Sequence, residues 1–285
     1  MEQYQYEFCG VSVQITAPYS VQEDAQAALF RRELQAESQL RIFLEPRDDL
    51  PEPEGQFCGC VGEKKTWRSG RSIIRYTQDL FRQFPHIGVT YDLTQPSDVR
   101  AVVRRQDWDW STGSKYLWTG AALNQLLIHF RTLFFHASYV AYQGSGILFT
   151  APSQTGKSTQ AELWRKYRGA QVVNGDKAAV SLRGCPMVHG IPFSGTSGIC
   201  GNVSLPLKAV VVLSQAPVST IRQMGPTEAV AAICQNVFAD QTIPEEWTLV
   251  LNLMLDLAAS VPIYALACTP DIRAVEMLER AMIPY

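Results

Sequence analysis

The alternation of hydrophobic and polar positions changes character close to residue 118. Beyond it, short apolar runs typical of strands alternate with longer stretches whose apolar residues recur every three or four positions, as in helices. The expected strands are 138–141, 147–150, 172–173, 180–182, 209–213 and 262–267, and the expected helices are 158–167, 226–238, 244–259 and 270–281. Strands that alternate with helices in this way predict an α/β domain.

The first 117 residues have a different pattern, with more strand-like segments and no phosphate-binding or catalytic signature. The expected elements are a hairpin over 4–16, a helix within 22–40, an acidic turn-rich loop over 48–55 and two strands within 66–74 that meet at Ser69-Gly70. Asp107-Trp108-Asp109-Trp110 alternates acid and aromatic, which favours a half-buried edge strand over an aromatic cage.

A domain boundary is expected between these two patterns. Leu123, Leu126, Leu127, Phe130 and Leu133 recur at helical spacing and predict a helix over 119–133 that opens the second domain. The sequence therefore predicts a smaller N-terminal α+β domain over 1–117 and an α/β domain over 118–285.

Composition and charge narrow the class of protein. The 285 residues are 46% hydrophobic and 18% charged, which is typical of a globular chain. The formal net charge of −2 gives no electrostatic reason to expect nucleic acid or an anionic membrane as a partner. No apolar run approaches the roughly 20 residues of a membrane span, and Met1-Glu2-Gln3 does not open a signal segment, so we expect a cytoplasmic protein.

The seven cysteines are odd in number and scattered along the chain, which favours reduced thiols over a disulfide framework. Cys58 and Cys60 could form half of a metal site, but no second pair with zinc-type spacing follows them. We therefore interpret them as small buried thiols beside a turn.

The strongest chemical signal is the stretch GILFTAPSQTGKSTQ at residues 146–160. Ala151 to Ser158 matches the phosphate-loop pattern A/G-x-x-x-x-G-K-S/T, between an expected strand and an expected helix. Gly156 permits the sharp turn that points backbone N–H groups at phosphate oxygens, and the helix N-terminus adds partial positive charge. Ala151 is acceptable in place of glycine provided that its φ is not positive. The expected nucleotide-binding residues are Ser153, Gln154, Thr155, Gly156, Lys157, Ser158 and Thr159.

Phosphoryl transfer assigns physical roles to three of the residues in and after this loop. Lys157 is expected at the β- and γ-phosphates of ATP, and the hydroxyl of Ser158 is expected on Mg²⁺. Asp176 is the carboxylate that follows shortly after a strand bordering the loop, so it is the best candidate for a base or a second metal ligand. The alternative is that Asp176 is an ordinary turn acid in Asn-Gly-Asp.

The surrounding residues resemble a known family. Phe135 to Thr150, running into Gly156-Lys157-Ser158, resembles the catalytic domain of HPr kinase/phosphorylase over roughly residues 119–213, with weaker support to the C-terminus. The resemblance implies a P-loop kinase domain of the HPr kinase C-terminal/PEP carboxykinase-like type, and it makes a homo-oligomer possible. It also implies that His136 lies near the carboxylate, as an orienting group or proton relay, although a core histidine is the alternative.

The chain departs from the resembled family at two places. Where that family has an acidic doublet, this sequence has Gly175 and Asp176, so one carboxylate stands where two are expected. The family's arginine- and glycine-rich signature is replaced by residues 190–198, which resemble a divergent branch of HPr-kinase-like proteins with peptide or small-molecule substrates. His189 and 194–198 form either a lid over the phosphates or a plain turn, and we assign no role to His86 and His129, which have the pattern of surface or helix-face residues.

Two classes of function fit these observations. The first is an ATP- and Mg²⁺-dependent kinase that phosphorylates a hydroxyl, with a peptide or protein serine as first choice and an amino acid or sugar as second. The other is a nucleotide-binding regulatory protein without transfer activity, which the glycine at 175 keeps open. A carboxykinase-like metabolic enzyme would need a second metal site, for which the sequence offers no cluster.

Overall fold

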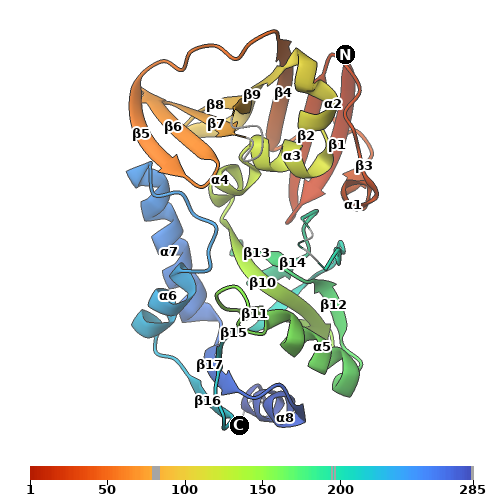
Figure 1. Cartoon of the computed structure of the whole chain (residues 1–285), viewed down its shortest axis with the longest axis vertical. Coiled ribbons are helices and arrows are strands. Elements are labelled where there is room, and N and C mark those ends of the chain that lie inside the picture. The colour runs from red at the N-terminus through yellow and green to blue at the C-terminus, as the bar shows by residue number, and fades with distance from the viewer. Residues whose placement is uncertain (79–83, 194, 196, 284–285) are drawn as a thin grey trace. The chain divides into compact units, whose positions relative to one another are not determined.

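The computed structural model describes residues 1–78, 84–193, 195 and 197–283 (Figure 1). The chain divides into two compact units. The first comprises Met1–His129 together with Asp240–Trp247, and the second comprises Phe130–Ala239 and Thr248–Tyr285. In the described part of the chain, no helix is long and apolar enough to cross a membrane.

The first unit is built on one mixed sheet. Its strands are β1 (Glu2–Phe8), β2 (Val11–Ala17), β3 (Arg31–Arg32), β4 (Leu40–Arg47), β5 (Gln56–Val61), β6 (Lys64–Ser69), β7 (Ser72–Gln78), β8 (Pro85–Asp92) and β9 (Gln95–Arg104). They lie in the order β3-β1-β2-β4-β9-β8-β7-β6-β5, with parallel pairing only at β2–β4 and β4–β9. The expected hairpin at 4–16 and the expected strand pair at 66–74 are confirmed, since β1 pairs with β2 and β6 with β7.

Short helices accompany this sheet: α1 (Ala25–Ala28), η1 (Arg105–Asp107), α2 (Trp108–Ser111), α3 (Ser114–Gly120) and α4 (Leu123–Ile128). Trp118 of α3 is buried against Tyr6 and Phe8, with ring centroids 4.9 and 4.7 Å away. The helix expected within 22–40 is the single turn α1, whose N–H groups are capped by Asp24.

Three expectations about this region's elements and thiols are wrong. Cys58 and Cys60, expected to be buried, are half-buried and exposed, respectively. The expected edge strand at 107–110 is helical, because Trp108 is buried with its Nε1–H donating to Ser20 O, and Thr112 closes the turn by bonding Trp108 O. The expected helix over 119–133 is broken after α3, where Ala122 has a left-handed φ of 56°. The chain then enters a strand at Thr132 instead of continuing as a helix.

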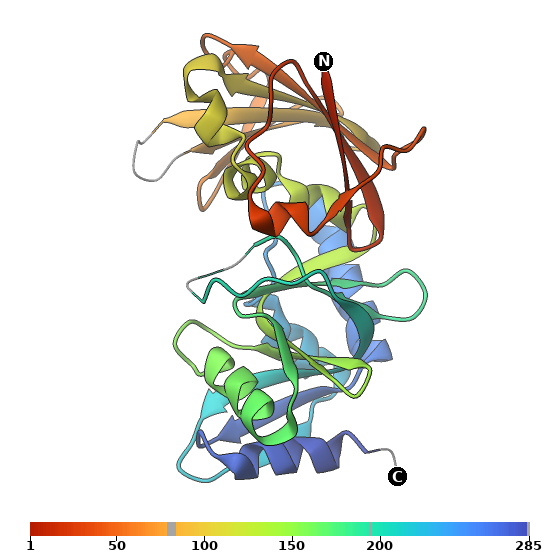
Figure 2. The same cartoon turned by 90° about the vertical axis from the view of Figure 1, so that its right-hand side faces the viewer.

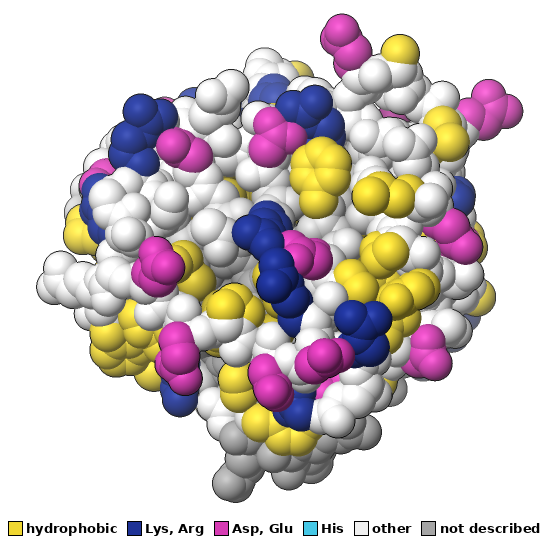
Figure 3. Space-filling view, turned by 90° about the horizontal axis from the view of Figure 1, so that it is seen from above, with side chains coloured by type: hydrophobic (Ala, Val, Ile, Leu, Met, Phe, Trp, Pro, Cys, Tyr) yellow, Lys and Arg dark blue, Asp and Glu magenta, His cyan; other side chains and the backbone are white. Residues whose placement is uncertain are grey.

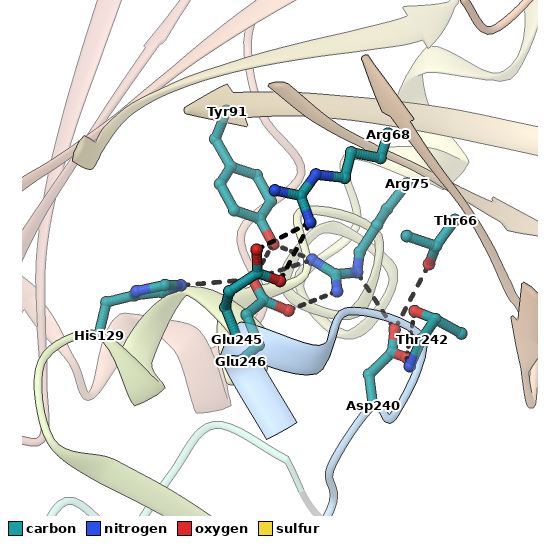
Figure 4. A network of polar contacts seen from close by, with 9 residues as sticks. All are labelled: Thr66, Arg68, Arg75, Tyr91, His129, Asp240, Thr242, Glu245 and Glu246. Atoms are coloured by element: carbon teal, nitrogen blue, oxygen red, sulfur yellow. Dashed lines mark hydrogen bonds and ion pairs between the residues drawn. The ribbon is translucent and has the colours of Figure 1, made fainter. Parts of the chain in front are cut away.

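A buried charge cluster ties residues 240–247 to the sheet of the first unit (Figure 4). The guanidinium of Arg75, on β7, is fully buried and pairs with Asp240 at 3.2 Å and with Glu246 at 2.6 Å. Tyr91 also bonds to both Arg75 and Glu246, and His129 Nε2 lies 3.3 Å from Glu246. This cluster gives His129 a specific partner, which its sequence pattern did not indicate.

His86, on β8, is the histidine of this unit that the sequence pattern misplaced. It is 2% exposed, with Nδ1 3.1 Å from Ser111 Oγ, so the surface or helix-face interpretation is wrong for it. On the face of the molecule in Figure 3, Lys and Arg side chains adjoin one another near the centre, with Asp and Glu side chains beside them.

The second unit combines strands and helices in alternation. Its strands are β10 (Thr132–Tyr142), β11 (Ser145–Thr150), β12 (Gln171–Asn174), β13 (Lys177–Ser181), β14 (Met187–His189), β15 (Ser204–Gln215), β16 (Thr220–Gln223) and β17 (Ile263–Cys268). Its helices are α5 (Lys157–Arg168), α6 (Pro226–Cys234), α8 (Ile272–Ala281) and α7 (Pro244–Ser260) from Thr248 onward. The α/β character and the expected order of these elements are confirmed.

The strand order brings several chain segments to one edge. β11, β15 and β17 are mutually parallel neighbours, and β10, β13 and β14 complete a closed circuit of pairings from β11 back to β15. The carboxyl ends of β11, β15 and β17 therefore lie at the same edge, the usual place for ligands in α/β folds. Figures 1 and 2 show α5 on one side of these strands and α6 and α7 on the other.

Helices α5 and α8 cover a common apolar core. Trp164 of α5 is fully buried among residues of β11, β15 and α8, including Phe149, Val211 and Leu278. Leu278 and Val275 lie on one face of α8 at a three-residue spacing, which explains its orientation toward the sheet. This packing fixes α5, and hence its N-terminus, at the carboxyl end of β11.

Candidate functional site

The loop from Ala151 to Gly156 joins the carboxyl end of β11 to the N-terminus of α5. Its left-handed residues are Gln154, with φ 66°, and Gly156, with φ 114°, whereas Ala151 is buried in an ordinary conformation. The alanine at 151 therefore costs the loop no backbone strain. Ser153, Gln154, Ser158 and Thr159 are exposed, and Thr155 and Gly156 are half-buried.

Lys157 is the first residue of α5 and folds back onto the loop. It is 6% exposed, and its Nζ donates to Ala151 O at 2.9 Å and to Pro152 O at 3.1 Å. Burial lowers its pKa, and the negative charge of Asp176 acts in the opposite direction. An ammonium has three donors, so Lys157 keeps one for an anion at the mouth of the loop.

Asp176 lies between β12 and β13, and His136 faces it from β10. His136 Nε2 is 3.2 Å from Asp176 Oδ1, and the two side chains are 25% and 33% exposed. Burial lowers the pKa of His136, as does the charge of Lys157, whereas Asp176 acts in the opposite direction. The carboxylate accepts the hydrogen bond from His136 Nε2–H. Thr150 Oγ1, at the end of β11, donates to His136 O at 3.0 Å and so ties this pair to the start of the loop.

Gly175 packs closely against Ser197. A Cβ built at this position would lie 2.2 Å from Ser197 Oγ, and one at Gly195 would lie 2.4 Å from Asp176 Cβ. Two glycines thus allow the described part of 195–199 to approach the 175–176 turn closely. The space that a side chain at 175 would need is filled by Ser197.

His189 does not belong to a lid. It lies in β14, is 5% exposed, and its two ring nitrogens are each 2.8 Å from a serine hydroxyl, of Ser181 and Ser204. Burial lowers its pKa to about 4. Of the 194–198 segment, residues 194 and 196 lie outside the described residues.

A cavity of about 610 Å³ opens on the other side of the loop. Gln154 and Thr155 line it from the loop, and further walls come from the carboxyl ends of β15 and β17. Polar residues beyond the loop also line it, among them Gln160 on α5 and Cys268 at the end of β17. No sequence motif indicates them, because their contact depends on the pairing of β15 with β17.

The second unit thus brings Lys157, His136 and Asp176 to the edge at which the loop lies. The exposed hydroxyl of Ser158 is in the first turn of α5, one residue beyond Lys157. Among the described residues, no group of three or more His, Cys, Asp or Glu side chains is placed to hold a metal ion. A protein-only metal cage is therefore absent from the described part of the chain.

Comparison with known proteins gives one family match. A family model described as "SynChlorMet cassette protein ScmC" matches residues 121–283, and comparison with curated proteins gives no match. Among solved structures, the chain is similar to the one titled "Structure of the Hpr(Ser) kinase/phosphatase from Coxiella burnetii", with 14% identity, a TM-score of 0.31, and coverage of 52% of this chain and 94% of that chain. A similarity this low supports no conclusion about the fold or function of this chain. Because the family match spans more than half of the chain, the protein belongs to the family of SynChlorMet cassette protein ScmC.

Proposed function

We propose that the second unit is a kinase that transfers the γ-phosphoryl group of ATP to a hydroxyl. The observation that carries this proposal is the hydrogen-bonded His136–Asp176 pair at the strand edge where the loop of Lys157 begins. A phosphate-holding loop alone indicates only an anion site. A half-exposed carboxylate beside it adds a group that can accept a proton.

The 151–158 loop binds the phosphates of ATP. Gly156 and the first turn of α5 supply backbone N–H groups and the positive end of a 12-residue helix. Lys157, whose Nζ donates to the carbonyls of Ala151 and Pro152, turns its remaining N–H toward the β- and γ-phosphates, where the ammonium pairs with negatively charged oxygens. Ser153, Gln154, Thr155 and Thr159 line the same mouth.

The donor set fits a magnesium ion held jointly with the nucleotide. Mg²⁺ is commonly bound through one or two carboxylates or hydroxyls plus substrate phosphates, rather than by an all-protein cage. Ser158 and Asp176 would hold it here. The ion, when bound, would neutralise charge on the phosphates.

Asp176 acts as the base in the transfer step. A bond forms between the acceptor oxygen and the γ-phosphorus, the bond from that phosphorus to the β–γ bridging oxygen breaks, and the acceptor proton moves to the Asp176 carboxylate, leaving ADP. His136 orients the carboxylate by donating its Nε2–H to Oδ1. Burial lowers the pKa of His136, which favours the neutral imidazole beside the carboxylate.

A serine of a peptide or protein is the acceptor that we propose first, and an amino acid or sugar is the second choice. This preference rests on the sequence resemblance of residues 119–213 to HPr kinase/phosphorylase. One carboxylate suffices for a single proton transfer, so the glycine at 175 does not remove the base.

The test compares Lys157→Ala with Lys166→Ala. Both lysines lie on α5, but Lys166 is exposed and its ammonium lies over the Tyr167 ring, away from the loop. Each protein is incubated with γ-labelled ATP, Mg²⁺ and cell extract, and labelled products are identified by mass spectrometry. We expect transfer by the wild type and by Lys166→Ala and its loss in Lys157→Ala; equal transfer by the two variants would refute the proposal.

The second candidate is a regulatory protein that binds a nucleotide without transferring phosphate. The observation in its favour is that a side chain at 175 would meet Ser197, so a second acid there would require Ser197 to move. This function predicts saturable ATP binding in an equilibrium titration together with no labelled product in the extract. Detection of a labelled product that requires Asp176 would exclude it.

A further inference from the structure

The cavity beside the loop is separate from the region of Asp176. It lies at the carboxyl ends of β15 and β17, whereas Asp176 follows β12, which pairs with β10. Strand β11, which leads into the loop, lies between β10 and β15. A nucleotide whose phosphates occupy the loop therefore has its γ-phosphate toward Asp176 only if its other end extends toward the cavity. At about 610 Å³ the cavity is within the usual range for small-molecule sites.

The cavity has apolar walls and a polar floor. Leu213, Pro217 and Pro270 contribute apolar surface at the ends of the two strands. Gln160, one helical turn beyond Gly156, also lines it and is only 2% exposed. A flat ring with apolar faces and a hydrogen-bonding edge matches a chamber of this composition.

The amide of Gln160 is only half satisfied. Its Nε2 donates to Cys268 Sγ at 3.1 Å, which fixes the side chain against the end of β17. Its Oε1 is buried and has no hydrogen-bond partner among the described residues. A buried acceptor without a donor is costly, so the site gains from a ligand that supplies an N–H group there.

We propose that this cavity binds the nucleobase of the donor nucleotide, and that Gln160 selects adenine by accepting a hydrogen bond from its exocyclic amino group. The inference rests on the proposed function, since it assigns the base to the nucleotide held by the 151–158 loop. Hypoxanthine has a carbonyl in place of that amino group, so it presents an acceptor to the acceptor Oε1. ATP therefore binds more tightly than inosine triphosphate.

Cys268 reports occupancy of the cavity independently of any transfer. Its thiol is half-buried in the cavity wall, and burial raises its pKa, so its alkylation is slow but measurable above neutral pH. The rate of N-ethylmaleimide labelling at Cys268 is followed by peptide mass spectrometry, with the exposed Cys185 of the same unit as internal control. The probes are ATP, adenosine and inorganic tripolyphosphate.

We expect saturating ATP or adenosine to slow labelling of Cys268 about tenfold, while tripolyphosphate leaves it unchanged and Cys185 reacts equally in all samples. If tripolyphosphate protects as well as ATP, or if adenosine and ATP give no protection, the cavity is not the base site. Protection by ATP and adenosine without any phosphate transfer would instead remove the proposed kinase activity and keep the base site.

The role of Gln160 is tested by the affinity ratio of ATP to inosine triphosphate in equilibrium titrations. We expect the wild type to prefer ATP about tenfold and Gln160→Leu to reduce that preference to about twofold or less. Gln171→Leu, at an exposed glutamine of β12, is the matched control and should keep the wild-type ratio. A wild type without preference, or an unchanged ratio in Gln160→Leu, would refute amide selection.

Discussion

Two clusters of charged residues, one in each unit, differ in how completely their groups are satisfied. In the first unit, Arg75 is fully buried, and Asp240 and Glu246 on either side of it are 1% exposed. In the second, Asp176 and His136 are a quarter to a third exposed, and Lys157 bonds only to carbonyls of its own loop. The first cluster has its donors matched to acceptors within the unit, whereas the second has open hydrogen-bonding capacity at a strand edge.

This difference separates a structural role from a chemical one. The free-energy cost of burying charged groups is offset only when hydrogen-bond and ion-pair partners surround them. A cluster whose groups are all paired has no free donor or acceptor for a ligand. A carboxylate that remains accessible, with one orienting partner and a lysine close enough to affect it, can exchange protons and bind ions. Perturbing each cluster should therefore affect a different measurement.

Asp176→Asn should produce the largest effect, and mainly on turnover. The amide retains the shape and can still contact His136 but cannot accept a proton, so we expect transfer to fall about 10² to 10⁴-fold, with the affinity for ATP in the absence of Mg²⁺ changed only slightly. The free energy of unfolding should stay within about 1 kcal/mol of wild type, because the side chain is a third exposed. Initial rates, ATP titration and urea unfolding measure the three quantities; wild-type turnover would exclude Asp176 as the base.

Arg75→Ala should have the opposite profile. It leaves two buried carboxylates without their cation, so we expect the free energy of unfolding to fall by about 3 to 5 kcal/mol. The control is Arg41→Ala, which removes an ion pair with Asp98 in the same unit where both side chains are about half exposed and should cost under about 1 kcal/mol. Equal losses in the two variants, measured by urea unfolding, would show that burial of Arg75 has no energetic consequence.

Local sequence patterns predicted more of the helices and strands of the second unit than of the first. The strand at 147–150, the loop and helix α5 were predictable because periodicity, a glycine and helix-forming residues agree over a short span. The packing of residues 240–247 in the first unit was not predictable, because it depends on contacts of Arg75 with carboxylates about 170 positions away. The prediction of a strand at 107–110 was wrong because tertiary burial of Trp108 outweighed the period-two pattern.

The candidate site was predictable only where its residues lie in one motif or keep a recognisable spacing. Lys157 and Ser158 follow from the loop, and the proximity of His136 and Asp176 was expected from the resemblance. The roles of Ser197 and Gln160 could not be predicted. That of Ser197 depends on its close approach to Gly175, and that of Gln160 depends on the pairing of β15 with β17. Neither relation leaves a periodic signal in the sequence.

His189, in the second unit, is a titratable group whose two ring nitrogens both have hydrogen-bond partners. Like the Arg75 cluster, it should therefore affect stability. Its pKa is about 4 in the folded state against a usual 6.5, so between these values the unfolded chain binds the additional proton. Stability contributed by neutral His189 is therefore present above pH 6.5 and is lost as the pH falls to 4, by about 3 kcal/mol. His189→Gln removes this titration, so its unfolding free energy should fall less than that of wild type between pH 6.5 and 4; parallel curves would contradict the prediction.

The smallest expected effect is at the contact between the 175–176 turn and Ser197. Gly175→Ala places a Cβ 2.2 Å from Ser197 Oγ, and we expect a loss of about 1 to 3 kcal/mol in stability as Ser197 is displaced. Because Ser197 is exposed, Ser197→Gly alone should cost less than about 1 kcal/mol, and in the Gly175→Ala background it should restore most of the loss. A double-mutant cycle by urea unfolding measures this coupling. Additive effects would mean that the two residues are independent, and that the glycine at 175 has a cause other than the space taken by Ser197.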